Sequence, residues 1–548
     1  MVSASTGSSQ PARGQESARS GLIVTVLGLL AAIQIADPFI SSVALVRASD
    51  GLEFTAAQQS LAAGISTFAL AATVVFGGVL ADRLGRKRVL VASILVSSAG
   101  QLITALSPEP TVYFLGRVIT GIALGATFAA AFGMVRDVVP EAERGPALAK
   151  FTIVGTIGPL TLMMIAGPVA QWDWRIAYLM LPVLSVLLFP FALKILPSVP
   201  IVAGTRFNVV PNLLIAIGVF GLLLGVSHAG VGLHSPQFFL PVAIGAASIV
   251  IFAIVTARSA HPVFPLRLLA HPAFLAAVIA GIGFNLGGAG LSIMTSNIWQ
   301  YVVHMPTSLV GIAGAPSAIT AIIASIITGR LIKRGMPSSV LLASGLLVFV
   351  LAYLAMLPID AGSPYALYLP AVLLSGAATA ITSVVQGGLF LRLAPAPYFG
   401  PVTSSRTMYG QFGYALGLTG TTMLVNSFTA HRVDVGTAGA VVGDGNWDAI
   451  TTFMVSGQTS VAALETMGQP AVLQAYAGSV VLTSLILAAV AFVMAVVVFV
   501  LLHTRRAAVP MDEFLGIADA GSAAVTTAPT DTAPTDPAHE RTNSEKGT

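Results

Sequence analysis

The sequence has no cysteine among its 548 residues, and only 9% of them are charged. Without cysteine, the chain can form no disulfide, thiolate metal site or cysteine nucleophile. It also lacks phosphate-cradling loops, nucleophile elbows and zinc-ligand spacings, so we expect neither an enzyme nor an ATP-driven pump. A typical soluble protein has about 25% charged residues, whereas 55% of this chain is hydrophobic. The composition predicts an all-α protein with many membrane spans.

Basic residues exceed acidic ones only slightly, with a formal net charge of +4 at pH 7. Most of the basic residues lie in loops between apolar runs, which is typical of cytoplasmic loops rather than of a nucleic-acid surface. We therefore expect no nucleic acid, nucleotide, metal or other cofactor as a partner. The expected surroundings are a lipid bilayer, and the expected assembly is a monomer.

Long apolar runs alternate with short polar loops, and each run can cross a bilayer at about 1.5 Å of rise per residue. The runs predict fourteen spans, an even count that places both termini on one side. Of 26 Lys and Arg, three fall in outer loops, at Arg47, Arg175 and Arg432. Arg117 and Arg406 fall inside helices, and the rest lie on the side that the positive-inside rule makes cytoplasmic. The predicted spans are 21–46, 56–78, 89–107, 111–135, 147–170, 176–196, 209–229, 236–257, 273–301, 308–330, 338–357, 364–391, 399–427 and 474–502.

The runs group into two halves of six helices, separated by two inserted helices. Internal repeats of this kind are a general plan of secondary transporters. Both tails are polar and rich in small residues, which predicts disorder. Within a long outer loop, the stretch 461–467 favours a short amphipathic helix. The predicted parts are the tail 1–20, the first half 21–200, the inserted pair 201–260, the second half 261–502 with its outer loop 428–473, and the tail 503–548.

The stretch Gly78–Leu90 stands between two apolar runs and reads Gly-Val-Leu-Ala-Asp-Arg-Leu-Gly-Arg-Lys-Arg-Val-Leu. It contains one acid and four bases within seven residues, and its glycines permit a tight turn. One interpretation is a simple topology anchor, because positive charge holds a loop on the cytoplasmic face. The spacing resembles the loop 2–3 signature of the major facilitator superfamily, G-x-L-a-D-r-x-G-r-k-x-x-l.

This resemblance implies that the loop is a cytoplasmic gate. Exposed ion pairs and helix-end contacts contribute about 1 kcal/mol or less each, so such a gate can open on every transport cycle. The implied gate residues are Gly78, Asp82, Arg83, Gly85, Arg86 and Lys87.

Further stretches are similar to the fourteen-span drug:proton antiporter branch of that superfamily, and the similarity extends from about residue 21 to 502. Trp174-Arg-Ile-Ala-Tyr178 resembles the opening of its helix 6, and His261–Leu269 resembles its linker before helix 9. Trp299-Gln300, with Gly311 and Pro316, resembles its run across helices 9 and 10. The resemblance implies a plasma-membrane exporter of lipophilic or cationic small molecules that exchanges them for protons. One proton moving down 100 mV supplies ~2.3 kcal/mol, so no nucleotide is needed.

Of the 22 Asp and Glu, one falls deep in a predicted helix, Asp37. An ionisable group in the bilayer core costs at least ~2.5–3.5 kcal/mol and usually faces a cavity or a partner. Burial makes a carboxyl group easier to protonate, which suits a proton carrier. The alternative is that Asp37 caps a half-helix at a kink made by Pro38.

Arg117 lies in the stretch Arg-Val-Ile-Thr-Gly, which resembles the family's helix 4 signature R-x-x-q-G. The resemblance links this arginine to proton transfer. A buried guanidinium needs a carboxylate or carbonyl partner, and both Asp37 and carbonyl groups of the first helix remain open. For Arg406, we favour snorkelling to the cytoplasmic interface over burial.

The helix 5 pattern of the antiporter branch, G-x-x-x-G-P-x-x-G-G, is only partly present. Leu162 and Met163 stand where its paired glycines are expected. Small residues allow close helix packing, so their replacement weakens the implication of antiport. The packing residues that remain are Gly155, Gly158, Pro159 and Gly167.

The substrate cavity is expected to be apolar and aromatic, with a few polar groups. Polar residues in a helical bundle can instead hydrogen-bond between helices. Export of an endogenous lipid or natural product, uptake, facilitation and a non-transporting sensor remain alternative functions. The cavity candidates are Gln34, Asn285, Asn297, Trp299, Gln300, Gln386, Tyr409 and Gln411.

Overall fold

The computed structural model describes residues 10–139, 144–198, 209–229, 234–259, 266–393, 399–437, 439 and 447–515. Within these residues, the chain forms helices and turns and no strand. The predicted all-α class is therefore confirmed for the part of the chain that is described.

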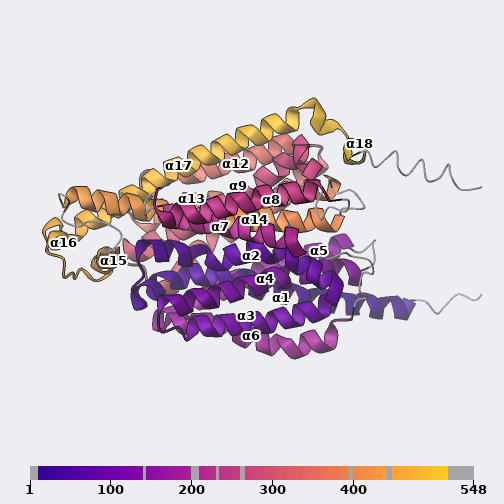
Figure 1. The fold of residues 1–548 in the computed structure, drawn as a ribbon, viewed down its shortest axis with the longest axis horizontal. Helices are drawn as coiled ribbons and strands as arrows, with labels where there is room; N and C mark the ends of the chain where they lie inside the picture. Colours follow the sequence, from indigo (N-terminus) through magenta and orange to yellow (C-terminus); the bar gives the residue numbers. More distant parts are fainter. Residues whose placement is uncertain are drawn as a thin grey trace, which may run out of the picture.

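The first half of the chain forms a bundle of antiparallel helices, coloured indigo to purple in Figure 1. α7 and α8 follow it and pack against each other. The helices are α1 (Gln10–Gly51), α2 (Ala56–Leu84), α3 (Arg86–Ala105), α4 (Pro110–Val138), α5 (Arg144–Trp172), α6 (Trp174–Ile195), α7 (Val209–Ser227) and α8 (Pro236–Ala257).

The second half forms a second bundle, and its long helix α14 packs against α2 of the first half as well as α9 of its own. Its elements are η3 (Leu266–Ala270), α9 (Pro272–Tyr301), α10 (Thr307–Gly314), α11 (Pro316–Lys333), α12 (Ser338–Leu354), η4 (Tyr365–Leu367), α13 (Leu369–Leu393), α14 (Phe399–Gly436), α15 (Trp447–Ser456), α16 (Ala462–Met467), α17 (Gln469–His503), η7 (Arg505–Ala508) and α18 (Met511–Leu515).

The two ends of the molecule differ. The short helices α15 and α16 project from one end, and α18 lies at the opposite end (Figure 1). We call these the cap end and the tail end. The turn between α2 and α3 lies at the tail end, because α1 runs from the tail end to the cap end and α2 returns.

Local sequence signals explain where several helices start. Thr55 precedes α2, and its side chain accepts a hydrogen bond from the Gln58 backbone while the Gln58 side chain accepts one from the Thr55 backbone. This reciprocal capping satisfies two backbone donors that a helix start leaves open. Asp173 caps α6 by accepting from the Arg175 backbone, and Ser235 caps α8 in the same manner from Phe238.

Some predicted boundaries are wrong. The single helix predicted over 308–330 is two, α10 and α11, because Pro316 starts a new helix. The helix predicted to end at 427 continues as α14 to Gly436, so part of the predicted outer loop is helical. The short helix predicted at 461–467 is confirmed as α16. α1 passes Pro38 without a break, so no half-helix starts or ends at Asp37.

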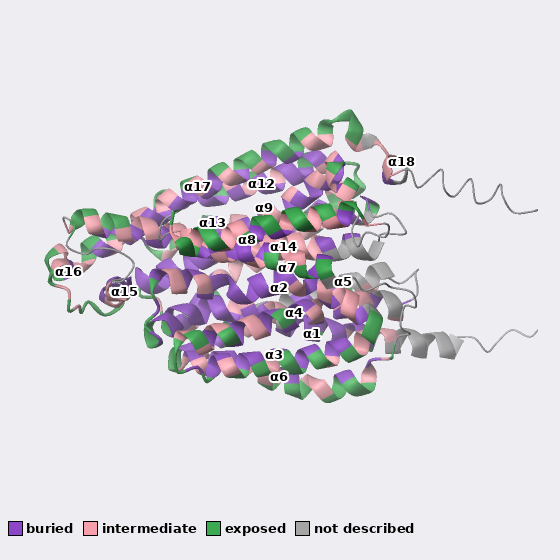
Figure 2. Cartoon of the chain, viewed as in Figure 1, coloured by how far each residue is buried: buried purple, intermediate pink, exposed green. Residues whose placement is uncertain are grey.

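The exterior is apolar, as a bilayer requires. Ten helices within the described residues are long and apolar enough to cross a membrane; the count of fourteen spans stays a prediction. Buried residues run through the middle of both bundles, and exposed ones lie along the outer helices (Figure 2). Large apolar side chains on those helices are exposed, which fits contact with lipid rather than water. Examples are Val186 and Leu187 of α6, Phe239 and Leu240 of α8, Ile322 and Ile323 of α11, and Phe492 and Val493 of α17.

Candidate functional site

The deepest charged pair of the described residues joins α1 to α4. Asp37 is fully buried, and Arg117 is 1% exposed. Arg117 Nη1 donates to Asp37 Oδ1 at 2.7 Å, and Nη2 donates to Oδ2 at 2.9 Å. This two-point geometry is the strong form of an arginine–carboxylate pair. Of the two partners that the sequence left open for Arg117, the structure selects Asp37.

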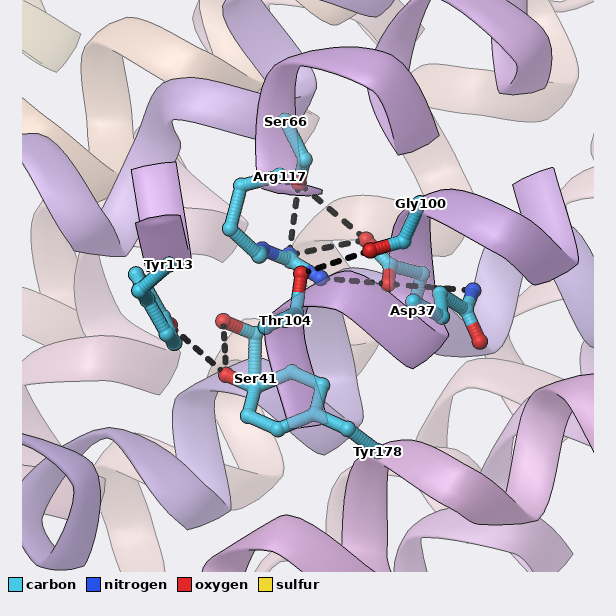
Figure 3. A network of polar contacts seen from close by, with 9 residues as sticks. Asp37, Ser41, Ser66, Gly100, Thr104, Tyr113, Arg117 and Tyr178 are labelled. Atoms are coloured by element: carbon cyan, nitrogen blue, oxygen red, sulfur yellow. Dashed lines mark hydrogen bonds and ion pairs between the residues drawn. The ribbon is translucent and has the colours of Figure 1, made fainter. Parts of the chain in front are cut away.

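Ser66 of α2 forms hydrogen bonds with both members of the pair. Its hydroxyl accepts from Arg117 Nη2 at 2.6 Å and donates to Asp37 Oδ2 at 3.1 Å, as Figure 3 shows. Gln101 of α3 donates to Asp37 Oδ1 at 3.5 Å. Four helices of the first half, α1 to α4, therefore meet at one carboxylate.

A glycine lets α2 come close enough for this contact. Gly121 lies one helical turn after Arg117, and a Cβ atom there would collide with the backbone oxygen of Ser66. Any other residue would separate α2 from α4 and move the Ser66 hydroxyl away from the guanidinium.

Two tyrosines extend the network toward the cap end. The Arg117 guanidinium lies 5.2 Å from the centre of the Tyr178 ring, within the range of a cation–π contact. The Tyr178 hydroxyl is 2.8 Å from that of Tyr113 and 3.1 Å from that of Ser41 (Figure 3). The Tyr178 ring thus contacts the guanidinium, and the hydrogen bonds with Tyr113 and Ser41 fix the position of that ring.

The pair is electrically neutral and almost fully buried. The free-energy cost of removing two charges from water is offset only where the pair has good geometry and makes further hydrogen bonds. Both conditions hold here. Sequence reasoning found Asp37 and Arg117 because a charge in an apolar run is unusual. It missed Ser66 and Gln101, which carry no such signal. It named Tyr178 only as part of the helix 6 motif.

The predicted gate loop is a single residue long. Gly85 separates α2 from α3 with φ +91°, a backbone conformation that favours glycine. Lys87 donates to the carbonyl oxygen of Leu193 in α6 at 2.7 Å, and Arg86 lies against Gly133 of α4. Gly78 lies within α2, Arg83 is exposed, and the Asp82 side chain lies outside the described residues. The basic residues of this motif thus connect α3 to α4 and α6.

Two glycines of the helix 5 pattern lie where α5 comes close to another helix. A Cβ at Gly158 would come within 2.5 Å of the Ala32 Cβ on α1, and one at Gly167 within 2.6 Å of the Thr307 oxygen on α10. Gly155 also faces α1, and Pro159 is buried. Gly167 therefore brings the two halves together near the cap end.

A second residue joins the halves at the cap end. Gln59 of α2 is fully buried. Its amide nitrogen donates to the Tyr301 hydroxyl, and its oxygen accepts from Asn426 Nδ2 at 3.0 Å and Trp447 Nε1 at 3.1 Å. No signal in the sequence marks Gln59. The contact ties the first half to α9, α14 and the cap helix α15.

The cavity candidates do not form one group. Asn297 and Trp299 are buried in the second half, where Trp299 packs on Tyr365 and Tyr368. Gln300 lines a cap-end pocket of about 290 Å³ together with Arg47, Asp50 and His304. Gln411 is partly exposed, and the Gln34 side chain lies outside the described residues.

The other candidates lie near Arg406. Gln386 of α13 accepts from Arg406 Nε at 2.8 Å, and Asn285 lies beside Gly410 on the next turn of α14. Tyr409 is partly buried nearby on α14. Arg406 turns toward α13 rather than along α14 to the helix start, so the expected snorkelling is wrong. In the described parts of the chain, no cluster of three or more His, Asp or Glu is placed to hold a metal ion.

Known proteins resemble this chain over most of its length. It is 26% identical over 442 residues to the puromycin resistance protein pur8 of Streptomyces alboniger, covering 78% of this chain and 85% of that protein. It is also 26% identical over 385 residues to an uncharacterized MFS-type transporter of Mycobacterium tuberculosis. That match covers 69% of this chain but 56% of the relative, so the chain spans little more than half of that protein's length.

Solved structures share the fold. The inward-facing, unoccupied crystal structure of a bacterial homolog to the human lysosomal transporter Spinster matches with a TM-score of 0.60 at 15% identity. The match covers 90% of this chain and 98% of that one. Residues 26–418 match the family model described as Major Facilitator Superfamily. This chain therefore belongs to the Major Facilitator Superfamily of membrane transporters.

Proposed function

We propose that this protein is a proton-coupled exporter of lipophilic or cationic small molecules that works by alternating access as a monomer in the plasma membrane. In this proposal, the chain spans the membrane fourteen times, the cap end faces outward and the tail end faces the cytoplasm. The names of relatives such as the puromycin resistance protein support export of drugs. The observation that carries the proposal is the buried pair of Asp37 and Arg117.

The pair suits a proton-driven switch. Protonation of Asp37 would cancel its charge, so the ion pair would become weaker hydrogen bonds from the guanidinium to a neutral carboxyl group. Arg117 would keep its contacts with Ser66 and with the Tyr178 ring. The link between α1 and α4 would therefore weaken on protonation and strengthen again when the proton leaves.

The contacts at the two ends suit alternation between open states. At the cap end, the halves are joined through Gln59 and through the close approach of Gly167 to α10. At the tail end, the contacts of the implied gate, such as that of Lys87 with the Leu193 carbonyl, stay within the first half. Each exposed contact of this kind contributes about 1 kcal/mol or less, so one transport cycle can break it.

The test uses purified protein in liposomes that contain a trapped pH dye. Puromycin and a panel of lipophilic cations and acids are added outside, and proton movement is recorded. Asp37→Asn is compared with Asp50→Asn, a matched change at an exposed carboxylate of the same helix. We expect compound-dependent proton flux in the wild type and in Asp50→Asn, and none in Asp37→Asn. Flux that persists in Asp37→Asn would refute Asp37 as the proton carrier.

A further inference from the structure

Arg406 is a second basic residue inside the bundle. It lies seven residues into α14, about 10 Å from the tail-end start of that helix at the usual helical rise. Its Nε atom donates to Gln386 Oε1 at 2.8 Å. Gln386 is 1% exposed and donates in turn to the backbone oxygen of Ala277 on α9 at 3.3 Å. The guanidinium is therefore held in place through one of its three nitrogens.

No acid balances this charge in the described residues. Arg406 makes no ion pair there, and Gln386 is its one polar partner among them. This differs from Arg117, which has a carboxylate at 2.7 Å. The terminal nitrogen Nη2 faces Gly387, 3.4 Å from where a side chain would begin. The Nη1–Nη2 fork is thus left to bind something else.

The surroundings of Arg406 are partly exposed and include apolar side chains. Residues 406–412 of α14 are all only partly buried, although α14 packs between α2 and α9. Tyr409 packs against the apolar cluster of Phe274 and Phe390. On the side of the first half, Met408 packs against Leu70, Val74 and Leu124.

We propose that Arg406 binds the anionic group of the transported molecule, which is a lipophilic acid such as an aryl carboxylate or sulfonate. An arginine fork matches the two oxygens of such a group, and an unpaired charge inside a membrane bundle is costly unless a ligand neutralises it. Asp37 and Arg117 cancel each other's charge, so in this proposal Arg406 gives the place where the substrate binds one positive charge, which would repel a cation. This inference rests on the proposed export function and narrows its lipophilic or cationic substrates to lipophilic anions.

The absence of cysteine provides a clean test, because a single introduced thiol reports on one place. Tyr409→Cys and, separately, Asn285→Cys are placed in otherwise wild-type protein in phosphatidylcholine nanodiscs. The labelling rate is measured for two methanethiosulfonates, one carrying a sulfonate and one carrying a trimethylammonium group. Each measurement is repeated in proteins that also carry Arg406→Gln, or Arg406→Lys as the charge-conserving control.

The measured quantity is the labelling rate of the sulfonate reagent divided by that of the trimethylammonium reagent. We expect this ratio to be at least about tenfold higher in protein that keeps Arg406 than in the Arg406→Gln variant, because a nearby charge acts oppositely on the two reagents. Arg406→Lys should keep most of the preference. 2-Naphthylacetate should slow labelling more than 2-naphthylethanol does, and only when Arg406 is present.

Three results would overturn the inference. They are a rate ratio that Arg406→Gln leaves unchanged at both thiols, equal protection by the naphthyl acid and the alcohol, and failure of both thiols to react. Adding phosphatidylglycerol to the nanodiscs separates the two sources of an anion, and protection by that lipid but not by 2-naphthylacetate would assign Arg406 to a headgroup and also overturn the proposal. None of these readouts involves proton flux, so failure of proton coupling at Asp37 would be seen separately.

Discussion

Removing either partner of the Asp37–Arg117 pair should destabilise the protein, but with different dependence on pH. Asp37→Asn leaves a guanidinium that is 1% exposed without a counter-charge. A buried charge stranded in this way costs about 3–5 kcal/mol. Arginine stays protonated at any pH at which the protein can be studied, so this cost should not change with pH.

Arg117→Gln instead leaves a buried carboxylate without a counter-charge. A carboxylate can lose its charge by taking up a proton. Protonating a carboxylate becomes easier as the pH falls, by ~1.36 kcal/mol for each pH unit. We therefore expect Arg117→Gln to gain stability relative to Asp37→Asn on acidification, by up to about 2.7 kcal/mol between pH 7 and pH 5.

The measurement is the free energy of unfolding, obtained by titrating the purified protein in mild detergent with sodium dodecyl sulfate at pH 5, 6 and 7. The double variant Asp37→Asn with Arg117→Gln should be more stable than Asp37→Asn alone, because no charge is then left buried. An Asp37→Asn variant that regains stability on acidification, or an Arg117→Gln variant whose stability ignores pH, would refute this account of the pair.

Three other changes test the packing and the cap. Gly158→Val should lower the thermal unfolding midpoint, with a cost of about 1–3 kcal/mol from the clash with Ala32; Gly329→Val, where no atom lies within 4 Å, is the control, and equal midpoints would count against the packing argument. Gly85→Ala should cost about 1–3 kcal/mol because of the positive φ, and unchanged thermal stability would contradict this. Burial, together with the neighbouring carboxylates, raises the pKa of Asp448, so its protonated form favours the folded cap and stability falls as pH rises through that raised pKa. Asp448→Asn should therefore slow hydrogen exchange in α15 at neutral pH, with the difference from wild type closing on acidification; a difference that widens at low pH would reverse the sign of the argument.

The sequence was most informative where a residue type conflicts with its surroundings. Asp37 and Arg117 stand out because charges are rare in long apolar runs. Gly85 stands out because a tight turn must fit between two apolar runs. Such conflicts are visible without coordinates, and they led to the buried pair and to the turn at the tail end.

Residues that look ordinary in the sequence could not be found in this way. Ser66, Gln59 and Gln386 are common polar residues in helices, and their importance depends on which helix lies opposite. Trp299 shows the reverse case, because a motif named it as a cavity candidate and the fold places it in an aromatic core.

The amino-acid sequence by itself determined the helical membrane class, the asymmetry of basic residues and the superfamily, because these depend on composition and on short local patterns. Only the tertiary structure decided that Arg117 pairs with Asp37 and that Arg406 has no acid beside it in the described residues. Both outcomes depend on how helices pack against one another, such as α1 with α4 and α13 with α14. Glycine contacts and side-chain volumes set the distance between such helices, and no local sequence pattern shows that distance.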